Sequence, residues 1–140
     1  PAPTVIVPPE FEDRFVPRLG AEYRIAAFGE LRSVHGHERP RRLVEFPVRG
    51  GYAYEQSPVP DQAGGTNYVD AHRHTFSAGF GVTINAPADE LGGSIHLDVH
   101  GALSVLPERV TSKASAADFV GDYRARGEMF GIGSTLGVVF

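Results

Sequence analysis

Cysteine is absent from this 140-residue sequence, which excludes a disulfide framework, a thiol nucleophile and a cysteine-based zinc site. Long apolar runs are absent too, since no segment approaches the roughly 20 residues that a transmembrane helix requires. Basic residues do not dominate, and the net charge of -4 argues against a nucleic-acid-binding protein. The N-terminal stretch PAPTVIVPPEF has no basic start and no long apolar core, so we do not expect a signal peptide there. Soluble β proteins and membrane β-barrels both remain, because barrel strands conceal their hydrophobicity in alternation.

What the sequence does contain is alternation. The last twelve residues, MFGIGSTLGVVF, switch between bulky apolar and very small side chains. Period two is the period of a β-strand, whose successive side chains point to opposite faces of a sheet. The small face carries almost no charge, whereas a strand of a soluble sandwich usually exposes polar side chains there. The open question is therefore which solvent the bulky face meets.

The same alternation recurs along the chain and predicts an all-β fold, an antiparallel meander of about five strands. We expect the strands at residues 14–25, 43–55, 74–84, 94–106 and 129–140, the last entered through Tyr123. Pro47 lies inside the second of these and predicts a bulge or local distortion. The connections are expected at 27–41, 55–73, 85–93 and 107–122. We treat residues 1–140 as a single segment, with 1–10 as an extended arm or loop and 11–140 as strands.

Each expected strand has one bulky apolar face and one small, polar or charged face, as the strands of a transmembrane β-barrel do. Each also runs about ten residues or more, long enough to cross a bilayer at a tilt. The residues predicted to face the membrane are Phe76, Phe80, Val82, Leu97, Leu136 and Phe140. Those predicted to face the barrel lumen are Arg18, Glu22, Arg24, Glu45, Arg49, Glu55, His96, Asp98 and His100.

The connections also follow the barrel pattern, in which extracellular loops are long and periplasmic turns are short. With the C-terminus in the periplasm, the long connections at 55–73 and 107–122 lie outside the cell. The short turn at 85–93 then lies inside. The connection at 27–41 is too long for this rule.

The stretch YAYEQSPVPDQAGGTNYVDAHRHTFSAGFGVTI resembles outer-membrane transport proteins of the FadL/OMPP1/TodX type. It has a Ser-Pro turn at 57–58, Asp70 followed by Arg73, and a strand at 75–81, in the order typical of that family. The stretches VPRLGAEYRI and GIGSTLGVVF are also similar to its barrel strands. The final Phe140, with apolar residues at every second position before it, resembles the signal that the outer-membrane assembly machinery binds.

This resemblance implies a protein of the bacterial outer membrane that passes long-chain fatty acids and other hydrophobic molecules. The family has a 14-stranded barrel with an N-terminal plug. Five strands cannot close a barrel, since about eight is the practical minimum. The chain is therefore expected to be a C-terminal part of such a barrel, supplying wall strands. Its expected partners are hydrophobic small molecules, the lipid bilayer and, through Phe140, the assembly machinery.

One cluster of side chains suggests metal binding. His96 and His100 alternate with Asp98 on one face of a strand, and such a histidine pair can ligate zinc. A polar lumen face is the alternative, and we favour it. A third zinc ligand would have to come from His35, His37, Asp70 or His74.

No nucleophile elbow and no HExxH motif is present, so we expect no enzyme, no catalytic residue, no metal and no cofactor. The charged row on the lumen side can either meet a carboxylate head group or hold the sheet together by cross-strand pairing, and we favour pairing. Two alternatives to the barrel remain. One is a soluble β-sandwich binding module with ligand-binding loops, and the other is a metal-dependent enzyme built around His96 and His100.

Overall fold

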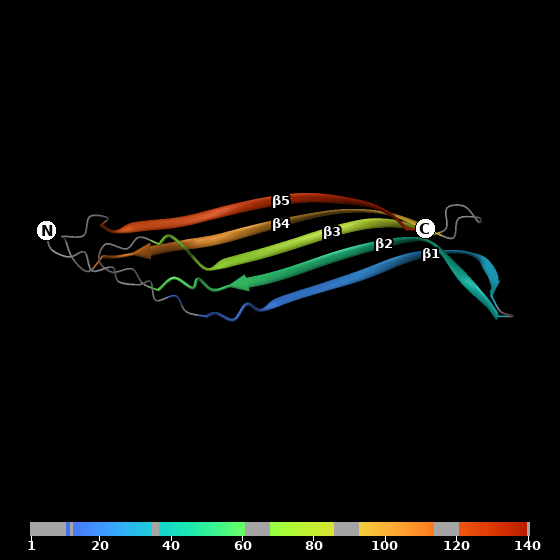
Figure 1. Ribbon diagram of the computed structural model, residues 1–140, viewed down its shortest axis with the longest axis horizontal. Coiled ribbons are helices and arrows are strands. Elements are labelled where there is room, and N and C mark those ends of the chain that lie inside the picture. The colour runs from blue at the N-terminus through green and yellow to red at the C-terminus, as the bar shows by residue number, and fades with distance from the viewer. Residues whose placement is uncertain are drawn as a thin grey trace. The chain divides into compact units, whose positions relative to one another are not determined.

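The chain forms one five-stranded antiparallel sheet in which sequence neighbours are also spatial neighbours, in the order β1-β2-β3-β4-β5 (Figure 1). The computed structural model describes residues 11, 13–34, 37–60, 68–85, 93–113 and 121–139. The strands are β1 (Arg18–Val34), β2 (His37–Glu55), β3 (Arg73–Asn85), β4 (Ser94–Thr111) and β5 (Tyr123–Val139). The predicted all-β meander of five strands is confirmed. In the described part of the chain the sheet is not closed, and β1 and β5 are its two edges.

Cross-strand contacts show that the two predicted faces exist. On one face the rings of Tyr52 on β2 and Phe76 on β3 lie 5.2 Å apart between centroids. On the other face the hydroxyls of Thr75 on β3 and Ser104 on β4 are hydrogen-bonded at 2.9 Å. Because Thr75 and Phe76 are consecutive, their side chains must leave opposite sides of β3.

The predicted connection at 27–41 is wrong. β1 continues to Val34 and β2 begins at His37, so most of those residues belong to the two strands. Their many charged side chains resemble a solvated loop in composition. However, charged side chains can occupy a strand as long as its backbone is paired and the side chains reach solvent. Two residues are enough to connect the strands of a hairpin.

Other strand ends also differ from the predicted ones. β1 begins at Arg18 instead of residue 14, β4 continues to Thr111, and β5 already starts at Tyr123. β2 continues through Pro47, which is buried. The 1–10 arm, His35 and Phe140 lie outside the described residues.

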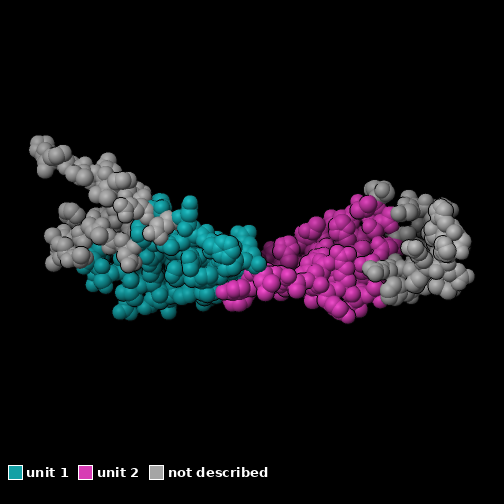
Figure 2. All heavy atoms as spheres, turned by 90° about the horizontal axis from the view of Figure 1, so that it is seen from below, with its two compact units in different colours: residues 1–18, 53–75, 104–129 teal, residues 19–52, 76–103, 130–140 magenta. Residues whose placement is uncertain are grey.

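The residues group into two compact units, coloured separately in Figure 2. Unit 1 comprises residues 1–18, 53–75 and 104–129, and unit 2 comprises 19–52, 76–103 and 130–140. Unit 1 contains the connections after β2 and β4 with the adjoining strand ends. Unit 2 contains the remaining lengths of all five strands.

Candidate functional site: two faces of a sheet and a clamped loop

In unit 2 the bulky apolar side chains are exposed instead of packed into a core. No side chain in the described part of the chain is fully buried. An exposed apolar patch beyond a few hundred Å² is unusual for a soluble monomer and marks a contact surface. For the predicted membrane-facing residues, the exposed fractions are 51% at Phe76, 61% at Phe80, 48% at Leu97 and 71% at Leu136, while Val82 is half-buried.

The exposed apolar rows of unit 2 have similar lengths on three strands. They run over 76–84 on β3, 95–103 on β4 and 130–138 on β5, nine residues each. A β-strand that crosses a bilayer at a tilt needs about 9–11 residues. On β5 the row begins sharply, since the residues of the same parity before Phe130 are Glu128, Arg126 and Arg124.

The same rows enclose a groove of about 630 Å³. Phe76, Phe80, Leu103 and Phe130 contribute to its lining, together with the small residues Ala78 and Gly101. A methyl group added at Gly101 would lie 3.9 Å from the Phe130 ring. We define the exposed side chains of the three nine-residue rows as the apolar face.

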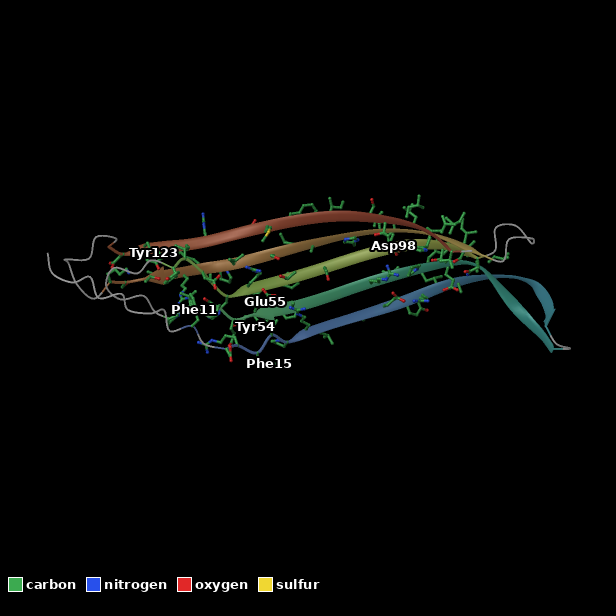
Figure 3. All side chains as sticks on the ribbon, viewed as in Figure 1. Phe11, Phe15, Tyr54, Glu55, Asp98 and Tyr123 are labelled. Carbon is green, nitrogen blue, oxygen red and sulfur yellow. The ribbon has the colours of Figure 1, made fainter. Side chains whose placement is uncertain are left out.

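The opposite, polar face of unit 2 carries an ion network that joins three strands. Arg49 on β2 donates through Nε to Glu22 on β1 and through Nη1 to Asp98 on β4, each at 2.5 Å. Arg24 donates to Glu22 and lies 3.8 Å from Glu45 in an ion pair. Five of the nine predicted lumen-facing residues thus pair with one another. Asp98 is labelled in Figure 3. The preferred interpretation, cross-strand pairing, describes this network.

Arg49 reaches Asp98 because the intervening strand β3 has no side chains in the way. β3 presents Gly79 and Gly81 to the polar face. A methyl group at Gly81 would collide with the carboxylate of Asp98 and lie 3.0 Å from the carbonyl oxygen of Leu97. Gly81 therefore leaves the space that the Asp98 carboxylate occupies in the ion pair, whereas Gly79 lies against His100.

The two histidines of β4 use glycines in the same way, but towards β5. The His100 ring lies over Gly133 and the His96 ring over Gly137, so that a methyl group at either glycine would collide with the ring. Asp98 instead approaches Gly81 on β3. The predicted polar triad is therefore divided between two neighbouring strands.

Among the residues that the structure describes, no group of three or more potential ligands is placed to hold a metal ion. The same described residues contain no helix that is long and apolar enough to span a membrane.

The remaining predicted lumen residues lie in unit 1, where two arginines share one carboxylate. Glu55, labelled in Figure 3, lies 3.7 Å from Arg18 and accepts a hydrogen bond from Arg73 at 3.2 Å. Two positive charges face one negative charge, and the buried Nε of Arg73 has no partner among the described residues. The group therefore keeps a net positive charge.

Unit 1 also contains a loop clamp, which we define as Ser57, Val59, Asp70 and Arg109. Arg109 of β4 donates to the Ser57 hydroxyl at 3.1 Å and to the carbonyl oxygens of Asp70 at 3.3 Å and Val59 at 3.0 Å. The Ser57 hydroxyl donates to the Asp70 carboxylate at 2.8 Å and accepts from the Val59 amide at 3.2 Å. These bonds hold both ends of the β2–β3 connection against β4. Among the described residues of unit 1, Ser57, Val59, Ala71 and Thr111 are buried.

Ser57, Asp70 and His72 lie together but do not form a nucleophile and base pair. His72 accepts a hydrogen bond at Nδ1 from the backbone amide of Ser57, not from its hydroxyl. That hydroxyl already donates to Asp70. The cluster is a satisfied hydrogen-bond network that fixes the connection.

Beside the clamp lies a cavity of about 450 Å³. Arg14, His72, Glu108 and Arg109 supply its charged and polar lining, while Val59, Pro60 and Pro107 supply apolar surface. A cavity of this size and mixed lining suits a small molecule with both a polar and an apolar part.

The sequence alone does not indicate the loop clamp. Arg109 lies within the expected 107–122 connection, whereas the structure places it on β4. Its partner Ser57 lies 52 residues earlier, a separation that no local pattern records. The sequence singles out the Ser57-Pro58 turn and Asp70 through the family resemblance, and Asp70 also as a possible zinc ligand, but neither as a partner of Arg109.

No protein-family model, no curated protein and no solved structure matches this chain.

Proposed function

We propose that this chain forms part of the wall of a bacterial outer-membrane β-barrel that passes hydrophobic molecules such as long-chain fatty acids. The observation that carries the proposal is the apolar face of unit 2. Phe80 and Leu136 are 61% and 71% exposed on a single sheet whose other face carries paired charges and glycines. A lipid bilayer is the solvent that makes such exposure favourable.

The connections give further support. β1 and β2 are separated by residues 35–36 only, and β3 and β4 by 86–93. β2 and β3 are separated by 56–72, and β4 and β5 by 112–122. In a meander the first two connections lie at one end of the strands and the last two at the other. Short turns at one end and long loops at the other match periplasmic and extracellular ends.

The polar face and unit 1 supply the contacts for a solute in this proposal. A hydrophobic molecule enters past the clamped β2–β3 connection and moves along the inner side of the wall by diffusion. The positive group around Arg18 and Arg73, together with the cavity beside Arg109, attracts a carboxylate at the end of the solute, since guanidinium groups bind carboxylates strongly.

The competing candidate, a soluble β-sandwich, needs the apolar face to be covered. In the described part of the chain no second sheet covers it, so a sandwich would require a further sheet from outside these residues. We treat this as the outcome that would overturn the proposal.

The test is uptake of a fluorescent long-chain fatty acid by cells that make the protein. We expect uptake above that of cells without it, and we expect the protein in the outer-membrane fraction. Phe80→Asp should remove both, because it places a carboxylate on the membrane side of β3. Ser77→Asp, an exposed position on the polar face of the same strand, is the matched control and should keep the protein in the membrane. Recovery of the unaltered protein as a soluble monomer without detergent would contradict the proposal.

A further inference from the structure

Glu55 and two arginines of unit 1 meet where three strands end. Arg18 is the first residue of β1, Glu55 the last of β2 and Arg73 the first of β3. These positions share one end of the sheet, because neighbouring strands run in opposite directions. One oxygen of the Glu55 carboxylate lies 3.7 Å from Arg18, and the other accepts a hydrogen bond from Arg73 at 3.2 Å. Each carboxylate oxygen thus faces its own guanidinium group.

The pairing within this group is loose. The separation of Arg18 from Glu55 exceeds the hydrogen-bond range, and the bond from Arg73 is at the long end of that range. All three side chains reach solvent, with exposed fractions of 72% for Arg18, 39% for Arg73 and 33% for Glu55. Exposed ion pairs change an equilibrium constant by about fivefold at most. An external anion can therefore replace the Glu55 carboxylate with little loss.

The two arginines also offer more than Glu55 uses. Two positive charges face one negative charge, and among the described residues no other carboxylate pairs with Arg18 or Arg73. The Nε of Arg73 is buried and has no hydrogen-bond partner in the same part of the chain. A buried donor without an acceptor is unfavourable, and a guanidinium group can bind a carboxylate through two parallel hydrogen bonds. The group therefore has donors and charge for a further anion.

The backbone around the group is fixed independently of the Glu55 side chain. The amide of Tyr54 donates to the carbonyl oxygen of Pro17 at 3.1 Å, which joins the backbones directly before Glu55 and Arg18. The loop clamp holds both ends of the β2–β3 connection, between Glu55 and Arg73. Both guanidinium groups therefore keep their backbone positions when the Glu55 side chain moves away.

The ion network of unit 2 is the opposite case. It brings three carboxylates to two guanidinium groups, those of Glu22, Glu45 and Asp98 to those of Arg24 and Arg49. Its negative charges outnumber its positive ones, so an added anion would be repelled. Of the two charged groups, only the one around Glu55 has the balance that an anion site needs.

We propose that Glu55 is an internal competitor for the carboxylate of a solute, which binds between Arg18 and Arg73 by displacing the Glu55 side chain. When the solute leaves, Glu55 returns to the two guanidinium groups, so that release is easier than from an unoccupied pair of arginines. The exchange keeps the affinity moderate and favours solutes with a carboxylate over uncharged ones. This inference rests on the proposed function, because it takes the solute to be an amphipathic carboxylic acid.

The test measures the binding of fluorescently labelled dodecanoic acid, and of the matching alcohol, to the whole protein in phospholipid vesicles. Protein-free vesicles give the background. Glu55→Gln removes the competing charge and keeps the size of the side chain. Glu128→Gln removes the same charge at an exposed position of β5 in unit 1 and is the matched control. Arg18→Gln removes one of the two guanidinium groups at a strongly exposed position.

Glu55→Gln should tighten binding of the acid by about fivefold and leave binding of the alcohol unchanged, because only the acid competes with Glu55. Arg18→Gln should weaken binding of the acid, and Glu128→Gln should change neither. In cells, Glu55→Gln should lower both the concentration at half-maximal uptake and the maximal rate, since release becomes slower.

An acid affinity that Glu55→Gln leaves unchanged or lowers, or a tightening that the alcohol shares, would overturn the role of Glu55. An acid affinity that does not respond to Arg18→Gln would overturn it as well, because the acid would then not bind between the two arginines. Absence of uptake by the unaltered protein would instead count against the proposed function, and the binding comparison would still decide the role of Glu55.

Discussion

Replacing Phe80 by arginine tests whether the apolar face meets lipid. Phe80 lies in the middle of the nine-residue row 76–84 and is 61% exposed, so in a bilayer its side chain is near the midplane. Arginine on the lipid face of a barrel at that depth costs about 2–4 kcal/mol. This cost corresponds to a roughly 30- to 700-fold decrease in the folding equilibrium constant, at about 1.4 kcal/mol for each factor of ten.

The assay is the guanidinium-dependent unfolding of the assembled protein in phospholipid vesicles. Ser77→Arg on the polar face of the same strand is the control, and we expect a change near the ±0.5 kcal/mol typical of exposed positions. If Phe80 faces water, Phe80→Arg should also change stability by no more than that. Equal, small effects of the two substitutions would therefore refute the assignment of the face.

Three further predictions concern contacts within single units. Gly81→Val should lower the unfolding midpoint in the same assay, because its side chain would displace Asp98 from Arg49; an unchanged midpoint would contradict the close approach. In the same vesicles, Arg49→Ala should slightly lower the midpoint of unfolding by urea, an uncharged denaturant, and the difference should vanish at about 1 M salt, since exposed ion pairs are screened. Arg109→Ala should speed amide hydrogen exchange at Val59, because the Val59 carbonyl oxygen and the Ser57 hydroxyl lose their donor. The free energy of local opening should fall by about 1–3 kcal/mol. Arg109→Lys should not restore protection, since lysine cannot reproduce the forked donors, and full restoration would count against the clamp.

The faces of the strands could be predicted from the sequence because a period-two pattern determines them locally. On β3, the alternation of Phe76 and Phe80 with Ser77 and Gly79 fixes which side chains share a side, whatever the neighbouring strands do. The same holds for Leu97 on β4. The sequence does not decide whether these side chains are exposed, as in a barrel wall, or buried, as in a sandwich, because burial depends on what covers the sheet.

The hairpin between β1 and β2 could not be predicted, because its charged residues resemble a loop in composition. The register between strands is also absent from a single sequence. The position of His96 over Gly137, and the crossing of Arg49 above Gly81, follow from how the strands are aligned. The period-two spacing indicates that His96 and Asp98 share a face, but not that they approach different neighbouring strands.

The clamp around Arg109 could not be predicted for two reasons, an unexpected strand end and a long-range contact. It depends on a strand that continues past Pro107 and on a contact with Ser57, 52 residues away. The connection was predicted to be long, but nothing in its sequence indicated that both of its ends would be fixed to β4.

The most direct test of the central claim is the lipid accessibility of successive positions along residues 76–84. The chain contains no cysteine, so single cysteines can be introduced and labelled with a nitroxide without background. In membranes, we predict that the even positions collide with dissolved oxygen but not with a water-soluble nickel complex, and that the odd positions show the opposite preference. Even positions that collide freely with the nickel complex, or that neither reagent reaches, would contradict a membrane-facing apolar face.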